Sequence, residues 1–441
     1  METLTLFACF GTLVTSTSIR QVAVIAQAML SMTGRVTMLS LSRWTAEGGS
    51  YRTILRFYAT KLPWQALQVK FFHSHIFNPA DEYIVVGDET IVSKSGTETY
   101  GLGRFYSGLQ KRVIKGLSFF VFSLCNVNQS ESSPVAVKQI IREKNEQVTP
   151  SKKKKKRDKT KRGRKPGSPN KDKMELNLSP ELLRISEILL GLMKLLKDFI
   201  KVKYLAMDGH FGHNQAVLMG LEQDLYLISK LRKDVALFEK YEGVYSGRGK
   251  PKKYGKRVRI ELMSPKYLKE SEVSGDLITN YYQGIFLHKE FGMELNVVVI
   301  VQINVKTKKL GQAVLFSNDV ELEWEKLVKY YRLRFQIEFN FRDAKQHFGL
   351  EDFMNQTEVG VENASNLSFL LLNLSAKLLK EREGNWIGIN DLKSQYRGMF
   401  YALETLKLVE PKAESNLIEK VKQVICRIGS IHRHNFSSSA T

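Results

Sequence analysis

Residues 203–230, KYLAMDGHFGHNQAVLMGLEQDLYLISK, contain the pattern that decides the fold. The apolar run at 203–207 predicts a strand, the segment at about 213–223 predicts a helix, and YLISK at 226–230 predicts a second strand. Strands that alternate with helices in this way are typical of a mixed α/β sheet. Outside this unit the pattern continues, with β-type runs at 83–87, 117–124, 134–140 and 296–305 and a helical segment at 180–200.

The first part of the chain has a helical pattern. Residues 20–62 predict helices, and Ser50, which follows a Gly-Gly pair, is a good N-cap residue. In the helix after it, Arg52 and Arg56 are four residues apart and would share one face. A DNA-binding helix-turn-helix would have this pattern, and so would an ordinary helical hairpin, so both interpretations stay open.

The positive charge is concentrated in two segments. The chain has 441 residues, with 67 Lys and Arg against 45 Asp and Glu, and a formal net charge of +22. Residues 151–173 carry a net charge of +11 and residues 247–259 carry +7, which together make 18 of the 22 excess charges. Charge so concentrated indicates loops that bind nucleic-acid phosphates, although a lysine-rich run can also be a solvated linker. The residues expected to bind the DNA backbone here are Arg162, Arg164, Lys252, Lys253 and Arg257.

Cysteine content and hydropathy indicate the compartment. The three cysteines, Cys9, Cys125 and Cys426, are far apart and form neither a disulfide framework nor a CxxC metal site. The apolar start of the chain is too short to span a bilayer and no basic segment precedes it. We therefore expect a soluble, cytoplasmic protein that does not enter the membrane.

Two aspartates directly follow predicted strands. Asp88 comes after YIVVG, and Asp208 comes after KYLAM. A carboxylate just past an apolar strand lies at the carboxyl edge of the sheet, where α/β proteins bind ligands. Either residue alone could equally be an ordinary turn-forming aspartate.

A long segment without glycine or proline comes later in the chain. Residues 319–348 predict one helix of about 40 Å, at a rise of about 1.5 Å per residue. Asn318 or Asp319 could cap its start, and Gly349 ends it.

One face of this predicted helix is polar. At 100° per residue Tyr331, Arg334, Glu338 and Lys345 fall within about 60° of one another, with Arg342 beside them. Such a face is not a core stripe. It could be a solvated face with an ion pair worth a few tenths of a kcal/mol, or one carboxylate among cations that bind phosphate.

Three carboxylates, two after strands and one on a helix, match what a pair of Mg²⁺ ions requires. Hard cations take oxygen ligands, and Mg²⁺ keeps positions open for phosphate and water. Two ions about 4 Å apart can activate a nucleophile and stabilise the leaving oxygen of a phosphodiester. The expected metal ligands are Asp88, Asp208 and Glu338, with Mn²⁺ able to replace Mg²⁺.

The spacing Tyr331-x2-Arg334-x3-Glu338-x6-Lys345 resembles the YREK signature of bacterial DDE insertion-sequence transposases. Residues 87–108 are similar to the region around the first catalytic aspartate of that family, and residues 205–217 to the region around the second. The resemblance covers roughly residues 80–350.

The resemblance implies both a fold and an activity. The fold would be α/β, an RNase H-like core with a β-rich insertion between the second aspartate and the glutamate, and with helical regions at both ends. Asp88, Asp208 and Glu338 would bind the metals, and Tyr331, Arg334 and Lys345 would contact the transposon ends. The reaction would be hydrolysis at the element ends and then attack of the freed 3′-hydroxyl on target DNA, carried out by a homodimer on double-stranded DNA. A nuclease without joining activity and a catalytically idle DNA-binding descendant are the alternatives.

The resemblance assigns no role to Trp324, His210 or His213. Some members of the family place a flipped base on a tryptophan, and the two histidines are expected to be ordinary residues at a helix start. The predicted division of the chain is 1–78, helical and DNA-binding; 79–146, first part of the core; 147–175, basic linker; 176–230, second part of the core; 231–316, β-rich insertion; 317–385, core with the signature helix; 386–441, helical C-terminal region.

Overall fold

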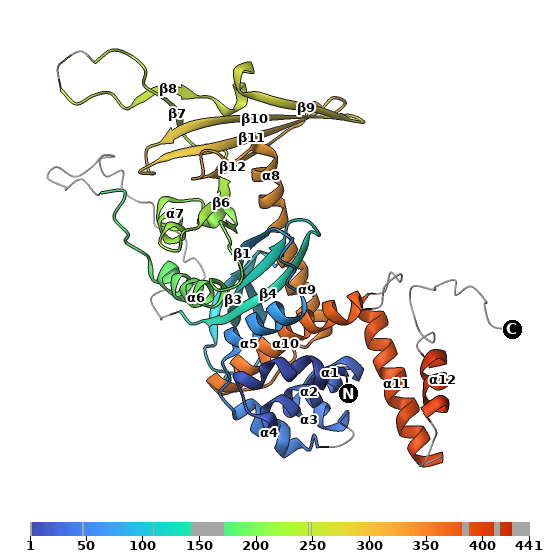
Figure 1. Cartoon of the computed structure of the whole chain (residues 1–441). Helices are drawn as coiled ribbons and strands as arrows, with labels where there is room; N and C mark the ends of the chain where they lie inside the picture. The colour runs from blue at the N-terminus through green and yellow to red at the C-terminus, as the bar shows by residue number, and fades with distance from the viewer. Residues whose placement is uncertain are drawn as a thin grey trace.

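The computed structural model describes residues 2–45, 48–108, 110–142, 172–245, 247, 249–381, 388–409 and 415–425. These residues form a mixed α/β structure in which 12 strands belong to one sheet. The strand order is β2-β3-β1-β5-β6-β12-β11-β10-β7-β8, with β4 added beside β3 and β9 beside β10. The N-terminal helices lie at one end of the molecule and the strands β9 to β12 at the other (Figure 1).

The N-terminal part is helical, as its pattern predicts. Its helices are α1 (Glu2–Phe7), α2 (Ser16–Ser31), α3 (Met38–Arg43), α4 (Tyr51–Ala59) and α5 (Trp64–His75). The prediction that Ser50 caps a helix is confirmed, because its side chain accepts the Thr53 N–H at 3.4 Å at the start of α4. Ile54 and Phe57 of α4 are buried, whereas Arg52 and Arg56 are exposed.

The centre of the sheet combines antiparallel and parallel strands. Its elements are β1 (Tyr83–Ser93), β2 (Gly103–Ser107), β3 (Arg112–Asn126), β4 (Glu131–Ile140), α6 (Pro180–Leu196), β5 (Tyr204–Met207), α7 (Asn214–Leu221) and β6 (Tyr226–Leu231). Strands β1, β3 and β4 pair antiparallel, and β5 and β6 continue the sheet parallel to β1. The predicted mixed α/β sheet is confirmed.

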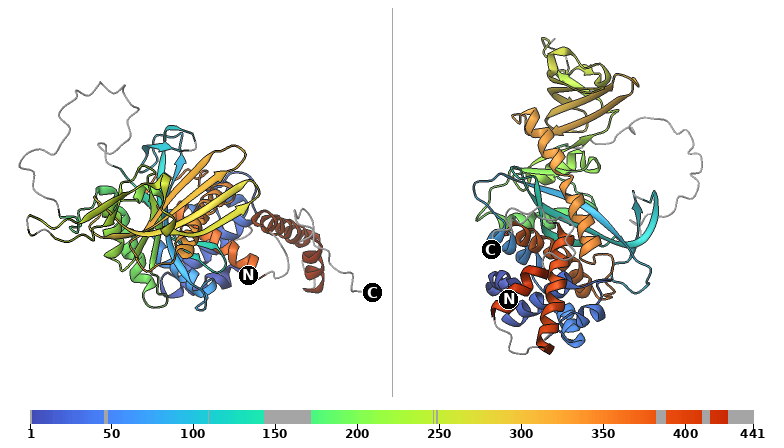
Figure 2. Two further views of the ribbon diagram at one scale, coloured as in Figure 1. Left: turned by 90° about the horizontal axis from the view of Figure 1, so that it is seen from above. Right: turned by 90° about the vertical axis from the view of Figure 1, so that its right-hand side faces the viewer.

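The segment between β6 and α8 is β-rich. It contains β7 (Leu237–Lys240), β8 (Tyr254–Val258), β9 (Leu268–Ser274), β10 (Leu277–His288), β11 (Glu294–Asn304) and β12 (Leu310–Ser317). Strand β12 pairs antiparallel with β6, from Val314 opposite Leu231 to Ser317 opposite Ile228. Backbone hydrogen bonds therefore join this segment to the central strands, and the right-hand view of Figure 2 shows it in yellow at the end of the molecule far from the N-terminus.

The last part of the described chain is helical, with α8 (Trp324–Leu333), α9 (Gln336–His347), α10 (Glu358–Lys380), α11 (Ile389–Val409) and α12 (Ser415–Ile425). The prediction of one long helix from residue 319 is wrong at two points. The first helix starts at Trp324 after the N-cap Glu323, because Asn318 and Asp319 are engaged elsewhere. The side chain of Asn318 accepts the Leu227 N–H, and that of Asp319 accepts the Tyr204 hydroxyl.

The second difference is a break between α8 and α9. The N–H groups of Arg334 and Phe335 donate to the carbonyls of Tyr331 and Arg332, three residues back instead of four. Both residues keep right-handed helical backbone angles, so the chain continues in nearly the same direction through a short tightened turn.

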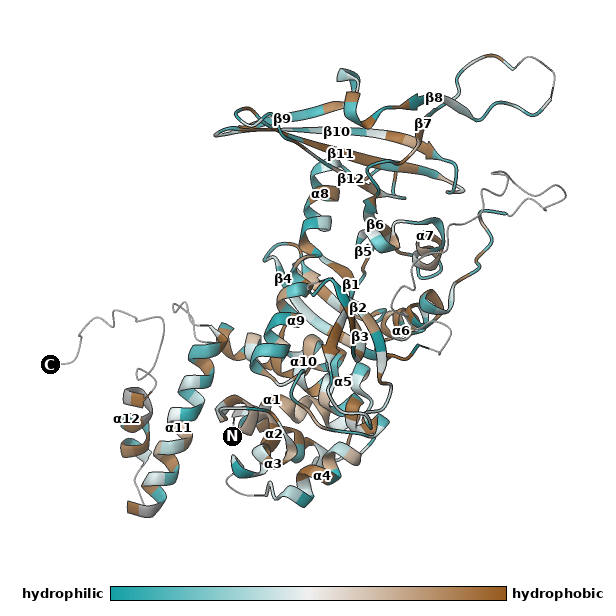
Figure 3. Ribbon diagram, turned by 180° about the vertical axis from the view of Figure 1, so that it is seen from behind, coloured by the Kyte–Doolittle hydropathy of each residue, from teal (hydrophilic) through white to brown (hydrophobic). Residues whose placement is uncertain are grey.

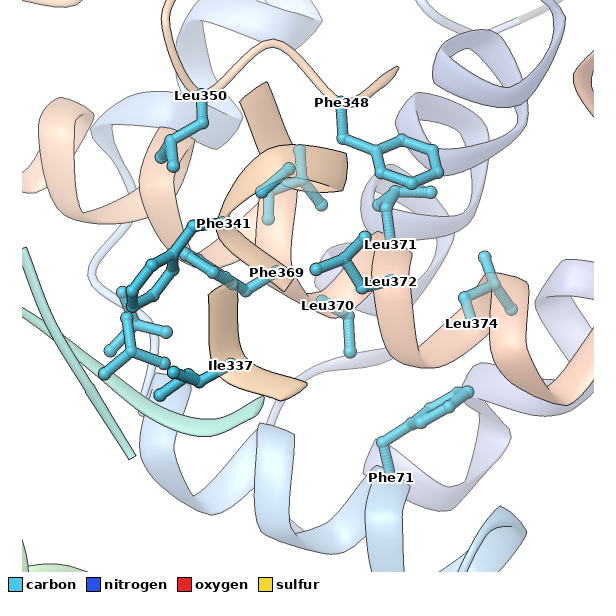
Figure 4. Close-up of a cluster of buried hydrophobic side chains, with 14 of the residues drawn as sticks. Phe71, Ile337, Phe341, Phe348, Leu350, Phe369, Leu370, Leu371, Leu372 and Leu374 are labelled. Atoms are coloured by element: carbon cyan, nitrogen blue, oxygen red, sulfur yellow. The ribbon is translucent and has the colours of Figure 1, made fainter. Parts of the chain in front are cut away.

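Buried side chains cover both faces of the sheet. On one face α9 packs against α10, where Ile337 and Phe341 meet Phe369 (Figure 4). Strand β11 contains the buried run Leu295–Val299, and Figure 3 shows much of this strand in the hydrophobic colour. None of the helices in the described ranges is long and apolar enough to cross a lipid bilayer.

Candidate active site

Asp88 and Asp208 lie beside each other at the centre of the sheet. Strand β1 pairs with the parallel strand β5 up to Gly87 opposite Met207, so the next residue on each strand is one of the two aspartates. The expectation that Asp88 ends its strand is wrong, because β1 continues to Ser93 in its pairing with β3. Asp208 does follow the last residue of β5, and its side chain accepts the His210 N–H at 3.1 Å.

Asp88 forms an ion pair with the arginine of the signature. Arg334 Nη1 donates to Asp88 Oδ2 at 2.8 Å, and the two side chains are only 14% and 16% exposed. Burial raises the pKa of Asp88 to about 6, although the charge of Arg334 and the Glu89 N–H act in the opposite direction. The charges of Asp208 and Glu338 raise the pKa of Asp88 further.

The other two signature residues near Arg334 in the sequence are Tyr331, on α8, and Glu338, on α9. The Arg334 guanidinium carbon lies 5.8 Å from the centre of the Tyr331 ring. Burial raises the pKa of Tyr331, and the charges of Asp208 and Asp88 add to that rise. Glu338 is exposed in the first turn of α9, where a carboxylate is favoured by the helix dipole.

Lys345 of the signature and the neighbouring Arg342 point elsewhere. Lys345 Nζ donates to the Ile91 carbonyl at 2.9 Å and lies 3.6 Å from Glu351 Oε1. Arg342 is exposed and pairs with its neighbour Asp343 at 2.8 Å. Lys345 thus binds β1 beyond Asp88, whereas Arg342 faces solvent.

The remaining predicted DNA contacts lie apart from the carboxylates. Arg52 and Arg56 are on α4, at the opposite end of the molecule from β7 and β8 (Figure 1). Lys252, Lys253 and Arg257 are exposed on and before β8, with Lys252 Nζ 4.8 Å from the centre of the Tyr241 ring. Arg162 and Arg164 lie outside the described residues.

The two histidines and the tryptophan have local partners. His213 caps α7 through its ring nitrogen, which accepts the Ala216 N–H at 3.4 Å. His210 Nε2 lies 3.2 Å from Glu181 Oε2, and this contact raises the pKa of His210. Trp324 packs on Tyr281 with ring centres 4.8 Å apart, at the side of a cavity of about 480 Å³.

Sequence reasoning missed a second ion pair beside Asp88. Arg142 Nη2 donates to both carboxylate oxygens of Glu89, at 3.0 and 3.1 Å, and the Ser118 hydroxyl also donates to Glu89. Arg142 lies just after β4, so this pair ties the end of that strand to β1. The only signal in the sequence was the position of Glu89 next to a candidate catalytic residue.

Comparison with known proteins identifies the family of this chain. The DDE superfamily endonuclease family matches residues 5–279, and the transposase DDE domain matches residues 185–374. The chain belongs to the DDE superfamily endonucleases. The two matches together support a DDE transposase, an enzyme that cleaves DNA by phosphoryl transfer.

Solved structures and curated proteins add little to this assignment. A cryo-EM structure of a piggyBac transposase synaptic complex with hairpin DNA is similar over 97% of this chain and 79% of that one. The identity is 10% and the TM-score 0.37. No curated protein matches this DDE endonuclease.

DDE transposases generally use divalent metal ions, and the carboxylates of this chain suit such an ion by their chemistry. Asp88, Asp208 and Glu338 provide oxygen ligands, and a dication would favour the ionised form of the buried Asp88. Among the described residues, however, no three His, Cys, Asp or Glu side chains are grouped closely enough to hold a metal ion. One oxygen of Asp88 is engaged by Arg334 instead.

Proposed function

We propose that this DDE transposase is a cut-and-paste enzyme that cleaves DNA at the terminal inverted repeats of its own element and joins the ends to target DNA. The observation that carries the proposal is the position of Asp88 and Asp208 after the paired residues Gly87 and Met207 of neighbouring strands, with Arg334 of the signature bonded to Asp88. An acidic group of this composition, on adjacent strands and on one helix, suits the two ions of a phosphoryl-transfer site. The YREK signature supports a place in the bacterial insertion-sequence class.

The fold supports an RNase H-like core under this site. Three antiparallel strands, β4, β3 and β1, are followed in the sheet by the parallel strands β5 and β6. The first aspartate is on the central strand β1, and the second follows its parallel neighbour β5. We divide the chain accordingly into a helical N-terminal region, this core, the β-rich segment 231–316 and a helical C-terminal region.

The residues around the carboxylates would act on the DNA backbone. Asp88, Asp208 and Glu338 would hold Mg²⁺ or Mn²⁺, which when bound activates the attacking oxygen and stabilises the leaving one. Tyr331 and Arg334 would hold the phosphates next to the bond that is cut, because an arginine fork matches phosphate oxygens. In the first step a water oxygen bonds to phosphorus and the 3′-oxygen leaves as a hydroxyl. In the second, the oxygen of that hydroxyl bonds to a phosphorus of the target strand, and the bond from that phosphorus to the target 3′-oxygen breaks, so that this oxygen leaves as a hydroxyl.

Double-stranded DNA is the partner that the charge distribution favours. The exposed cations Lys252, Lys253 and Arg257 would bind the backbone at the β-rich end, and Arg52 and Arg56 on α4 would bind the terminal repeats at the other. Contacts of this kind position DNA and give binding its dependence on salt. Two copies of the chain would act together, one for each end of the element.

The test uses purified protein and the DNA that flanks its own gene, with Mg²⁺ or with EDTA. Wild type should cut at inverted repeats on both sides only with metal, and Glu338→Gln should bind the same DNA without cutting. Glu325→Gln, a change at another glutamate of the same helical segment that lies away from Asp88, is the matched control and should cut normally.

The outcomes separate the alternatives. Cutting by Glu338→Gln at the wild-type rate would remove Glu338 from the site. Cutting without transfer of the new 3′ ends to a supercoiled target would indicate a nuclease without joining activity. Tight binding by wild type without any cut would indicate an idle DNA-binding descendant.

A further inference from the structure

The contact between Arg334 and Asp88 uses the same carboxylate that a metal ion would need. Arg334 Nη1 lies 2.8 Å from Asp88 Oδ2, and both side chains are largely buried. An arginine is permanently charged, so the pair is a strong, charge-assisted hydrogen bond in a region of reduced solvent screening. The cationic partner of Asp88 in this structure is therefore the Arg334 guanidinium.

The guanidinium is not fully satisfied in this position. Arg334 Nε is buried and has no hydrogen-bond partner, although a buried N–H without an acceptor is costly. The Tyr331 ring lies on one side of the group, 5.8 Å from ring centre to guanidinium carbon. A planar fork with a free donor is suited to bind a second anion, and a phosphate would accept from two of its N–H groups at once.

Charge balance argues against simultaneous occupancy by arginine and metal. Asp88, Asp208 and Glu338 together carry three negative charges when ionised, and Arg334 offsets one of them. A dication at Asp88 would lie next to the guanidinium, and two like charges a few ångströms apart repel strongly where water is scarce. A DNA phosphate would relieve that repulsion by binding the released arginine.

We propose that Arg334 occupies the place of the metal at Asp88 while the protein is free of DNA, and that it moves from Asp88 to a DNA phosphate when the site is loaded. This inference rests on the proposed function, because it concerns the same metal site. The arginine would delay metal binding until DNA is present to accept it. Its position at the turn between α8 and α9, beside the exposed Phe335, places it where the helix is least regular.

The first test measures Mn²⁺ binding by calorimetry, with the full chain and without DNA. At about pH 8.5 carboxylates are ionised in both proteins, so protons do not compete. Arg334→Gln should bind Mn²⁺ about tenfold more tightly than wild type, equivalent to about 1.4 kcal/mol. Arg332→Gln is the matched control, because Arg332 is a neighbouring arginine whose bond is to the Tyr281 hydroxyl. It should bind Mn²⁺ as wild type does.

A second test uses the wild-type chain alone, so it does not require that Arg334→Gln folds. A structure of the wild-type chain with Mn²⁺ and without DNA, at a metal concentration that saturates the calorimetric signal, should show Arg334 separated from Asp88. An ion bound at Asp88 with the arginine still at hydrogen-bond distance would overturn the inference. So would an equal or weaker Mn²⁺ affinity of the folded Arg334→Gln protein.

The variant Glu338→Gln separates a wrong metal site from a wrong competition between Arg334 and the metal. Glu338→Gln, in the same calorimeter, should lose Mn²⁺ affinity whether or not Arg334 competes. If it does and Arg334→Gln binds no more tightly than wild type, the metal site stands and the competition is wrong. If neither variant changes Mn²⁺ binding, the metal site itself is refuted, and the inference with it.

Discussion

The side chain of Asn363 connects the N-terminal helices to α10. It lies on α10 and is 1% exposed. Its amide nitrogen contacts the carbonyl oxygens of three residues at the end of α4, Phe57, Tyr58 and Thr60, at 3.2, 3.0 and 2.8 Å. Its oxygen accepts the indole N–H of the buried Trp64 at 2.6 Å. We predict that Asn363→Ala destabilises the protein strongly.

The magnitude follows from the groups left without partners. The Trp64 indole N–H would remain buried without an acceptor, at a cost of about 1–3 kcal/mol. The two best-placed carbonyls of α4 would lose their donor, each worth about 0.5–1.5 kcal/mol net, although water can reach the exposed end of that helix. Together these terms give about 3 kcal/mol. For a chain of 441 residues, with an unfolding entropy of about 2.1 cal/mol/K per residue, that equals a fall in Tm of about 3 °C.

Urea unfolding monitored by tryptophan fluorescence measures the change. Trp64→Phe removes the indole donor and keeps most of the ring volume, so Asn363→Ala should cost about 1 kcal/mol less in that background than alone. Additive effects of the two substitutions would show that the bond to Trp64 contributes nothing. A loss below about 1 kcal/mol for Asn363→Ala would refute the assignment of this residue as the link between α4 and α10.

Two further predictions concern charge. Deleting residues 152–165 should reduce the slope of log binding constant against log salt by about 0.9 for each DNA phosphate that this run neutralises, and an unchanged slope would make the run a spacer. Burial lowers the pKa of Lys94 to about 8 from its ordinary value near 10.5. Below about pH 8 the folded protein must therefore hold this lysine charged in an unfavourable environment, which lowers the free energy of unfolding. The stability of wild type relative to Lys94→Met should therefore rise as pH increases from about 8 to 10.5, and a difference independent of pH would contradict the shift.

Much of the local structure could be predicted from the sequence. Alternation and apolar runs located β1, β3, β4, β5 and β6, and the N-cap at Ser50 was correct because its hydrogen bond is local. The apolar runs that precede Asp88 and Asp208 are the paired strands β1 and β5, so the position of these two residues on neighbouring strands follows from local patterns.

Features set by distant parts of the chain could not be predicted. The end of β1 depends on its pairing with β3, which carries the strand past Asp88. Asp319 does not cap a helix because the Tyr204 hydroxyl, 115 positions away, donates to it. The hydrogen bond from Arg334 to Asp88 spans 246 positions, and periodicity on one helix gives no sign of it.

The pairing of β12 with β6 limits how this protein could be shortened. Along the sequence the β-rich segment looks removable, because it enters after β6 and returns just before α8. Its removal would leave the backbone groups of Ile228 to Leu231 without the partners that β12 provides. An exposed edge of buried, apolar strand is a template for association with other chains. The segment is thus joined to the central strands as one strand is joined to the next, and a soluble shortened protein would have to keep at least β12.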